Sequence, residues 1–274
     1  YLYHPRHIMG RHIYYSIKIR KLFSHFQEPF SIIVFSGKTH ADVQRNMSSL
    51  YTRLMYICMS YEKAMYLCLG EINNDTSANL LYYLGYFIML CTGAFDDIAW
   101  MLNNLYKLQL HRKNISLKGK EFRKKLEQHN KQLFNLIMEN APFYNKISQY
   151  YPIRDVLQHR NFLASGTLHG LGETSHYIIL DEEAYKKLFD KIKIKSQKQT
   201  DEQSTEYSVA PKILLEYLFK ELFEIINEIY KTVDWNVYKN ELDANSLKSV
   251  ENTMAKYNKG TGSLWGFHGE PMYL

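Results

Sequence analysis

The chain of 274 residues is poor in the residue types that break or cross-link secondary structure: it has 13 glycines, 6 prolines and 3 cysteines. So little glycine and proline excludes collagen-like and low-complexity sequences. It also argues against an all-β protein, which needs many tight turns. Hydrophobic residues make up 46% and charged residues 23% of the chain. A core of substantial size is therefore possible, and a disordered chain is excluded.

The three cysteines, Cys58, Cys68 and Cys91, are odd in number, lie among apolar residues and form no Cys-x-x-Cys pair. This pattern indicates buried thiols in a reducing compartment, and it argues against a disulfide framework or a zinc site. We therefore expect a cytoplasmic protein that uses no metal and no cofactor.

The net charge of +6 is mildly basic, and its distribution is more informative than its sum. Residues 1–25 carry five lysines and arginines and four histidines but no acidic residue, and residues 186–198 form a second basic stretch. Either stretch is suited to contacts with a phosphate backbone, although a basic run is more often a solvated face.

One uncharged run of 18 residues, Ala78–Phe95, is long enough to raise the question of a membrane span. It contains Asn79 and continues directly into Asp96 and Asp97. We therefore interpret it as a buried helix of a bundle, and we expect no membrane partner.

The apolar pattern from Ala41 onward recurs at three- and four-residue steps, which predicts helices. We predict an all-α fold, a bundle of four to five helices over residues 41–235. A hairpin-like insertion is expected at 166–182, where three glycines precede the strand-like run His176–Leu180. The polar residues 196–208 predict a mobile loop.

The two ends of the chain do not fit the bundle pattern. Residues 1–40 predict an N-terminal extension with one short strand, because Ser31–Phe35 is β-branched and apolar and lies between Pro29 and Gly37. Residues 236–274 predict a C-terminal tail, with a loop-like part from Asn258.

The residues 151–170, YPIRDVLQHRNFLASGTLHG, combine charged and polar side chains at a density unusual for a solvated helix face. The candidate site residues are Arg154, Asp155, His159, Arg160, Asn161 and His169. In a helix Asp155 and His159 are four residues apart and face the same way, so the carboxylate can fix which imidazole nitrogen stays free. Arg154 lies about 140° around the helix from His159. It must therefore bend towards the histidine or act together with a second subunit.

The spacing of Arg154, Asp155 and His159 resembles the Arg-x(4–6)-His signature of the HEPN superfamily, and IRDVLQHRN resembles its common LRN-x-x-x-HR form. The segment Gly93–Tyr106 is similar to the Cthe-2314-like branch. The resemblance implies an all-α homodimer in which two motifs share one cleft, and metal-independent RNA cleavage by attack of the 2′-hydroxyl. His159 would be the general acid or base and Arg154 would stabilise the phosphate. Arg160, Asn161 and His169 would bind the RNA.

Two alternatives remain open at this stage. Residues 160–166 resemble a second copy of the motif, with Ser165 where the histidine belongs; in that register the site is degenerate, or His169 substitutes for the missing histidine. The chain would then be an inactive HEPN-like module that binds RNA or a partner protein. If the Arg154/His159 site is active, the chain is expected to be a toxin-like or defence effector with an antitoxin or regulatory partner. However, Asn161 stands where HEPN toxins paired with a nucleotidyltransferase have tyrosine.

Overall fold

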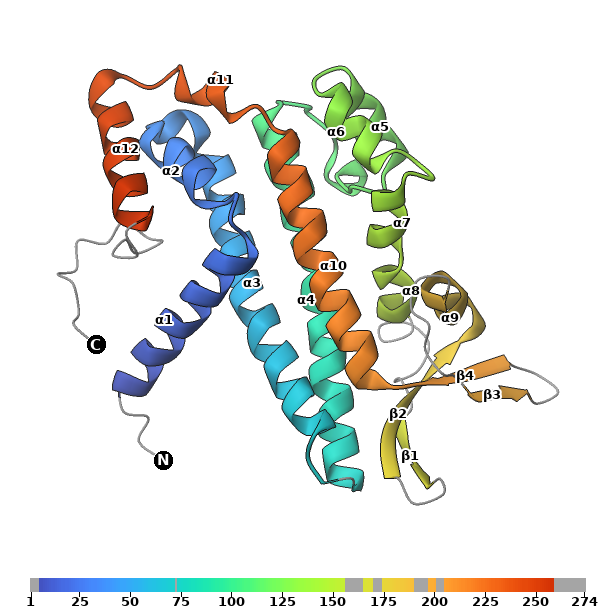
Figure 1. Ribbon diagram of the computed structural model, residues 1–274. Helices are drawn as coiled ribbons and strands as arrows, with labels where there is room; N and C mark the ends of the chain where they lie inside the picture. Colours follow the sequence, from blue (N-terminus) through green and yellow to red (C-terminus); the bar gives the residue numbers. More distant parts are fainter. Residues whose placement is uncertain are drawn as a thin grey trace. The chain divides into compact units, whose positions relative to one another are not determined.

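The computed structural model describes residues 5–71, 73–155, 165–169, 174–189, 197–200 and 205–258, and these are mostly helical, as the sequence predicts (Figure 1). The chain divides into two compact units, neither of which is contiguous in sequence. Unit 1 comprises Tyr1–Tyr51, Asp97–Phe134 and Ile226–Leu274. Unit 2 comprises Thr52–Asp96 and Asn135–Ile225.

Three long helices contribute residues to both units: α3 (Ala41–Cys68), α4 (Asn74–Leu105) and α10 (Pro211–Thr232). All three are helices that the periodicity predicts, and the predicted start at Ala41 is confirmed. Pro211 is the first residue of α10, a position where the missing N–H of proline costs no hydrogen bond.

One helix of the described residues, α4, has the length and apolar composition to cross a membrane. Half of its most apolar window of 18 residues is buried inside the protein. The core helix of a soluble protein has the same properties, so this helix does not by itself assign the chain to a membrane.

Unit 1 is helical throughout its described part. Besides its share of the long helices it holds α1 (Pro5–Leu22), α2 (Gln27–Phe35), α5 (Lys120–Glu127), α11 (Trp235–Lys239) and α12 (Ala244–Asn258), the short 3-10 turns η1 (Gly37–His40) and η2 (Arg112–Asn114), and the start of α6 (Lys131–Ile137). Both α11 and α12 pack against α2 (Figure 1).

Aromatic rings form the centre of unit 1. Phe23 packs edge-on against Tyr230 with ring centroids 4.7 Å apart, and Phe26 stacks on Tyr51 at 5.6 Å. All four are almost fully buried, and the Tyr230 hydroxyl donates to the sulfur of Met101 at 3.1 Å. Part of the large aromatic content is therefore core.

The strand predicted at Ser31–Phe35 is wrong, because these residues form the second half of α2. Ile32 and Ile33 are fully buried, as are most of their neighbours in this helix. A continuous apolar run is equally compatible with a buried strand and a buried helix. Pro29 lies within the first turn of the helix, where it breaks no hydrogen bond, and Ser36 N–H closes the last turn on the carbonyl of Ile32.

Unit 2 combines helices with a small sheet. After the end of α6 come α7 (Pro142–Ser148) and α8 (Tyr150–Asp155), then the strands β1 (Ser165–His169), β2 (Thr174–Asp181), β3 (Gln197–Thr200) and β4 (Thr205–Val209), with α9 (Glu182–Phe189) between β2 and β3. The strand order is β1-β2-β4-β3 and every pairing is antiparallel. The predicted hairpin at 166–182 is confirmed, with Gly166 opposite Tyr177.

The mobile loop predicted at 196–208 is wrong for its described residues, which belong to β3 and β4. Tyr207 stacks face to face on Tyr185 of α9 with ring centroids 3.7 Å apart, and Val209 is buried. The lysine and glutamines of β3 lie in an edge strand, where polar side chains are common. The polar composition of this segment therefore did not predict its two strands.

The predicted C-terminal tail is mostly helical where the structure describes it. The helix α12 buries Val250 and Tyr257, and the guanidinium of Arg20 lies 3.8 Å above the Tyr257 ring. Contacts with buried residues therefore stabilise α12, although the sequence of this helix is mostly polar. Residues 259–274 lie outside the described residues.

Candidate functional site

The helix α8 carries the first two residues of the predicted motif at its C-terminal end. Its first four residues, Tyr150–Ile153, are buried, whereas Arg154 and Asp155 are partly exposed. The sequence produces this arrangement because an apolar stretch is followed directly by two charged side chains. Arg154 and Asp155 are thus presented by a helix whose other residues are anchored.

Contacts with α10 hold α7 and α8 in place within unit 2. The Tyr150 hydroxyl donates to the carbonyl of Leu218 at 2.6 Å, and the Tyr217 hydroxyl donates to Oε1 of Gln149 at 3.0 Å. Burial, with the charge of Glu221 nearby, raises the pKa of Tyr217 to about 12. Tyr217 therefore stays protonated and remains a donor at neutral pH.

An ion-pair cluster adds a second link between α7 and α10. The ammonium of Lys146 lies 2.9 Å from a carboxylate oxygen of Glu221 and 2.9 Å from one of Glu224. Burial alone would lower the pKa of Lys146, but the hydrogen bonds and charges of the two carboxylates outweigh it and raise that pKa. The lysine is therefore charged at neutral pH, and the helix before α8 is fixed by charge as well as by apolar packing.

The side chain of Arg154 is oriented by its neighbours. Its Nε and Nη2 atoms both donate to Oδ1 of Asp155, at 3.0 and 2.7 Å, and its guanidinium carbon lies 4.6 Å from the centre of the Tyr151 ring. The side chain remains 26% exposed and that of Asp155 45%. An oriented, partly exposed guanidinium is suited to binding a phosphate or a carboxylate.

The rest of the predicted motif is not placed. His159, Arg160 and Asn161 lie outside the described residues, so the shared face of Asp155 and His159 is untested. His169 ends β1, where its backbone pairs with Thr174, and nothing is described of its side chain. Of the six predicted residues, only Arg154 and Asp155 are brought together, and both registers of the motif remain open.

A second histidine, which the sequence analysis did not select as a site residue, is buried in unit 2. His176 of β2 is 6% exposed, and its Nδ1 atom lies 3.1 Å from the Ser77 hydroxyl of α4. Among the residues that the structure describes, its Nε2 atom has no hydrogen-bond partner, and burial lowers the pKa of the imidazole. The sequence signal is the strand-like run His176–Leu180, which does not by itself indicate the contact with Ser77.

The residues that the structure describes contain no group of three or more histidines, cysteines or carboxylates that could hold a metal ion. They do contain a cavity in unit 1, which includes none of the predicted site residues. Its lining comes from four separate stretches of sequence, so local sequence patterns could not reveal it. Comparisons with known protein families, with curated proteins and with solved structures found no match.

Proposed function

We propose that the chain is a metal-independent endoribonuclease of the HEPN type, acting as a toxin-like or defence effector in the cytoplasm. The observation that carries this proposal is the oriented guanidinium of Arg154, at the exposed end of a helix that is otherwise anchored. The mostly helical fold, with long helices before and after Arg154, also supports it.

In the proposed reaction the 2′-hydroxyl of RNA attacks the adjacent phosphorus, and the bond from phosphorus to the 5′-oxygen breaks. One proton leaves the 2′-hydroxyl and one is delivered to the departing 5′-oxygen, with His159 as the acid or base. Arg154 stabilises the negative charge that develops on the non-bridging oxygens. The products carry a 2′,3′-cyclic phosphate and a 5′-hydroxyl. Arg160, Asn161 and His169 bind the strand.

Cleavage of RNA by the purified protein in EDTA, with analysis of the product ends, tests this proposal. We expect Arg154→Ala and His159→Ala each to lower the cleavage rate by about 100-fold or more, since each removes one catalytic group. Arg112→Ala is the matched control, because Arg112 is an exposed arginine of unit 1. Arg160→Ala tests the second register. Equal cleavage by the wild type and both variants, or no cleavage of any RNA, would contradict the proposal.

The shared cleft of the proposal requires a homodimer. Sedimentation or light scattering on the same samples gives the mass in solution. A monomer that cleaves RNA would contradict the composite site while leaving the roles of Arg154 and His159 in place. A co-purifying antitoxin or regulatory protein would be detected in the same measurement as added mass.

The second candidate is an inactive helical module that binds RNA or a partner protein. One observation favours it: two donors of Arg154 are already bonded to Asp155, as in a structural ion pair. Asp155→Ala separates the two functions. It frees the guanidinium and should alter cleavage in an enzyme, whereas in a binding module only affinity changes.

A further inference from the structure

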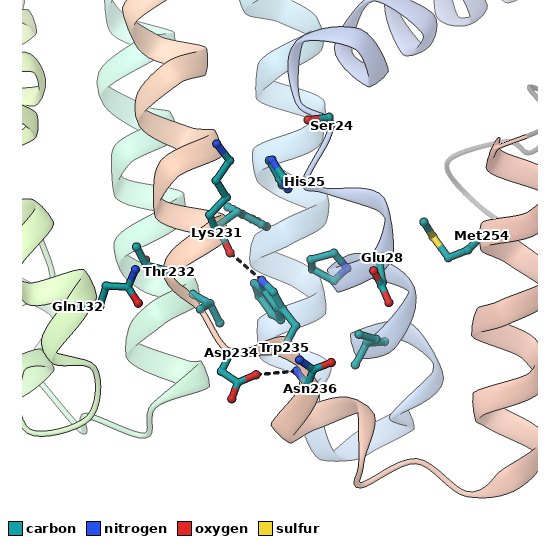
Figure 2. Close-up of a pocket in the computed structure, with 14 residues that line it drawn as sticks. Ser24, His25, Glu28, Gln132, Lys231, Thr232, Asp234, Trp235, Asn236 and Met254 are labelled. Carbon is teal, nitrogen blue, oxygen red and sulfur yellow. Dashed lines mark hydrogen bonds between the residues drawn. The ribbon is translucent and has the colours of Figure 1, made fainter.

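A cavity of about 550 Å³ opens in unit 1 beside the turn between α10 and α11 (Figure 2). This volume falls in the range of about 300–1,000 Å³ that small-molecule sites occupy. The walls come from the turn between α1 and α2, from α2 itself, from the end of α10 with the start of α11, and from single residues of α6 and α12. Segments that are far apart in the sequence thus line the same cavity.

One wall of the cavity is aromatic and fixed. The indole Nε1 of Trp235 donates to the carbonyl of Tyr230 at 2.9 Å, and the two rings lie 5.6 Å apart. Tyr238 packs near the same indole at 6.1 Å. Pro29 and Ile32 add apolar surface. Trp235 therefore offers a preorganised π surface, the preferred aromatic partner of a cation.

The ionisable groups of the cavity are predominantly acidic at neutral pH. The lining carboxylates are Glu28 and Asp234, and the lining ammonium is that of Lys231. Glu228, which pairs with Lys231, and Lys239, which pairs with Glu28, bring the total to three carboxylates and two ammonium groups. Burial, and then the charge of Lys231, lower the pKa of His25, so this imidazole is neutral. An anionic ligand would meet net negative charge here, whereas a cationic one would be attracted.

Each carboxylate has one oxygen in a contact. Asp234 Oδ1 accepts the backbone N–H of Asn236 at 3.1 Å and so caps α11, and Glu28 Oε1 lies 2.9 Å from the ammonium of Lys239. These contacts hold both carboxylates on the lining of the cavity, as Figure 2 shows for the bond between Asp234 and Asn236. Each carboxylate keeps a second oxygen that can accept further bonds.

We propose that this cavity binds a small organic cation of the amine class, with its charged nitrogen over Trp235 and hydrogen-bonded to Asp234 and Glu28. The site lies in unit 1 and uses neither Arg154 nor the segment after it, so it is independent of the proposed ribonuclease activity.

Calorimetric titration of the full chain with putrescine, spermidine and tetramethylammonium tests the proposal. We expect Asp234→Asn and Glu28→Gln each to weaken binding about tenfold. Asparagine also caps helices, so the first change removes charge while keeping the cap. Asp243→Asn is the matched control, because Asp243 caps α12 in the same way, accepting the N–H of Ser246, and does not line the cavity.

A pH series supplies an independent readout. The charged groups around His25 are Lys231 and Glu228 of α10, Glu28 of α2 and Asp234 of the turn. As the pH falls and His25 gains a proton, the cavity gains positive charge, and amine affinity should fall in the wild type. His25→Gln should make the amine affinity depend less on pH than that of the wild type does, whatever its absolute value.

Three outcomes would overturn the proposal. The first is no amine binding at millimolar concentration, and the second is binding that Asp243→Asn weakens as much as Asp234→Asn does. The third is binding of inorganic phosphate or a nucleotide that Lys231→Ala abolishes, which would make the cavity an anion site. Loss of binding in Trp235→Phe, with unchanged circular dichroism, would support the aromatic contact.

Discussion

His176 illustrates how much a single buried side chain can reveal about solution behaviour. Its imidazole is 6% exposed and has the Ser77 hydroxyl as its described partner. Burial alone lowers its pKa from the ordinary value of 6.5. At a pH near 6, His176 therefore binds a proton less readily in the folded chain than in the unfolded chain.

We predict that His176 makes the stability of the protein depend on pH in a defined window. Well above pH 6.5 the imidazole is neutral in both states and contributes nothing to the pH dependence. Below pH 6.5 the unfolded chain binds more protons than the folded one, so the free energy of unfolding falls as the pH falls. Urea unfolding between pH 5 and 8 measures this slope.

The control is His176→Asn, in which an amide can still reach Ser77 but does not titrate. Its slope between pH 5 and 6.5 should be shallower than that of the wild type, whatever its absolute stability. Identical slopes for the two proteins would show that the histidine is not buried in the folded state.

Among the elements, the sequence pattern predicts the long helices. The wrong predictions concern segments whose structure depends on contacts with distant parts of the chain. The periodicity from Ala41 predicts α3 because apolar residues recur every three or four positions, which places them on one face of a helix. The residues 31–35, and the described residues of the predicted loop 196–208, do not form the structures that local pattern predicts, because burial in a helix bundle and pairing in a sheet both depend on tertiary partners. The same limit applies to the site: the motif predicts Arg154 and Asp155, while the cavity beside Trp235 depends on segments that local pattern does not connect.

The link between α7 and α10 gives a prediction at the scale of elements. Lys146→Met leaves Glu221, which is 11% exposed, without its cation. We expect the free energy of unfolding to fall by about 1–3 kcal/mol, the cost of a buried polar group that loses its partner. Urea unfolding monitored by circular dichroism measures the change.

Lys220→Met is the matched control, since Lys220 is an exposed lysine of α10. The double change Lys146→Met with Glu221→Gln should recover part of the loss, because the orphaned charge is then removed. Equal effects at Lys146 and Lys220 would show that the cluster does not stabilise the helix pair.

At the scale of the whole molecule, α3, α4 and α10 each supply residues to both units. None of the three tryptophans of the sequence falls within the ranges of unit 2. Tryptophan fluorescence therefore reports on unit 1, whereas circular dichroism reports on every helix. We predict that the two signals give one coincident urea transition, since melting a shared helix removes core residues from both units.

The variant Lys146→Met tests the coupling directly, because Lys146 belongs to unit 2 and the tryptophan signal comes from unit 1. In a cooperative molecule the change lowers the tryptophan midpoint as much as the dichroism midpoint. Two separated transitions, with only the dichroism shifted, would contradict the coupling.

The interleaving of the two units also bears on how such a protein can change over evolutionary time. Unit 2 is assembled from two stretches of chain and unit 1 from three, with their borders inside helices. A single cut in the gene between the codons for residues 52 and 225 would split both units at once, and a cut outside that range would still split unit 1. The segment of gene that can be duplicated or fused with both units intact is therefore the one that encodes the whole interleaved chain.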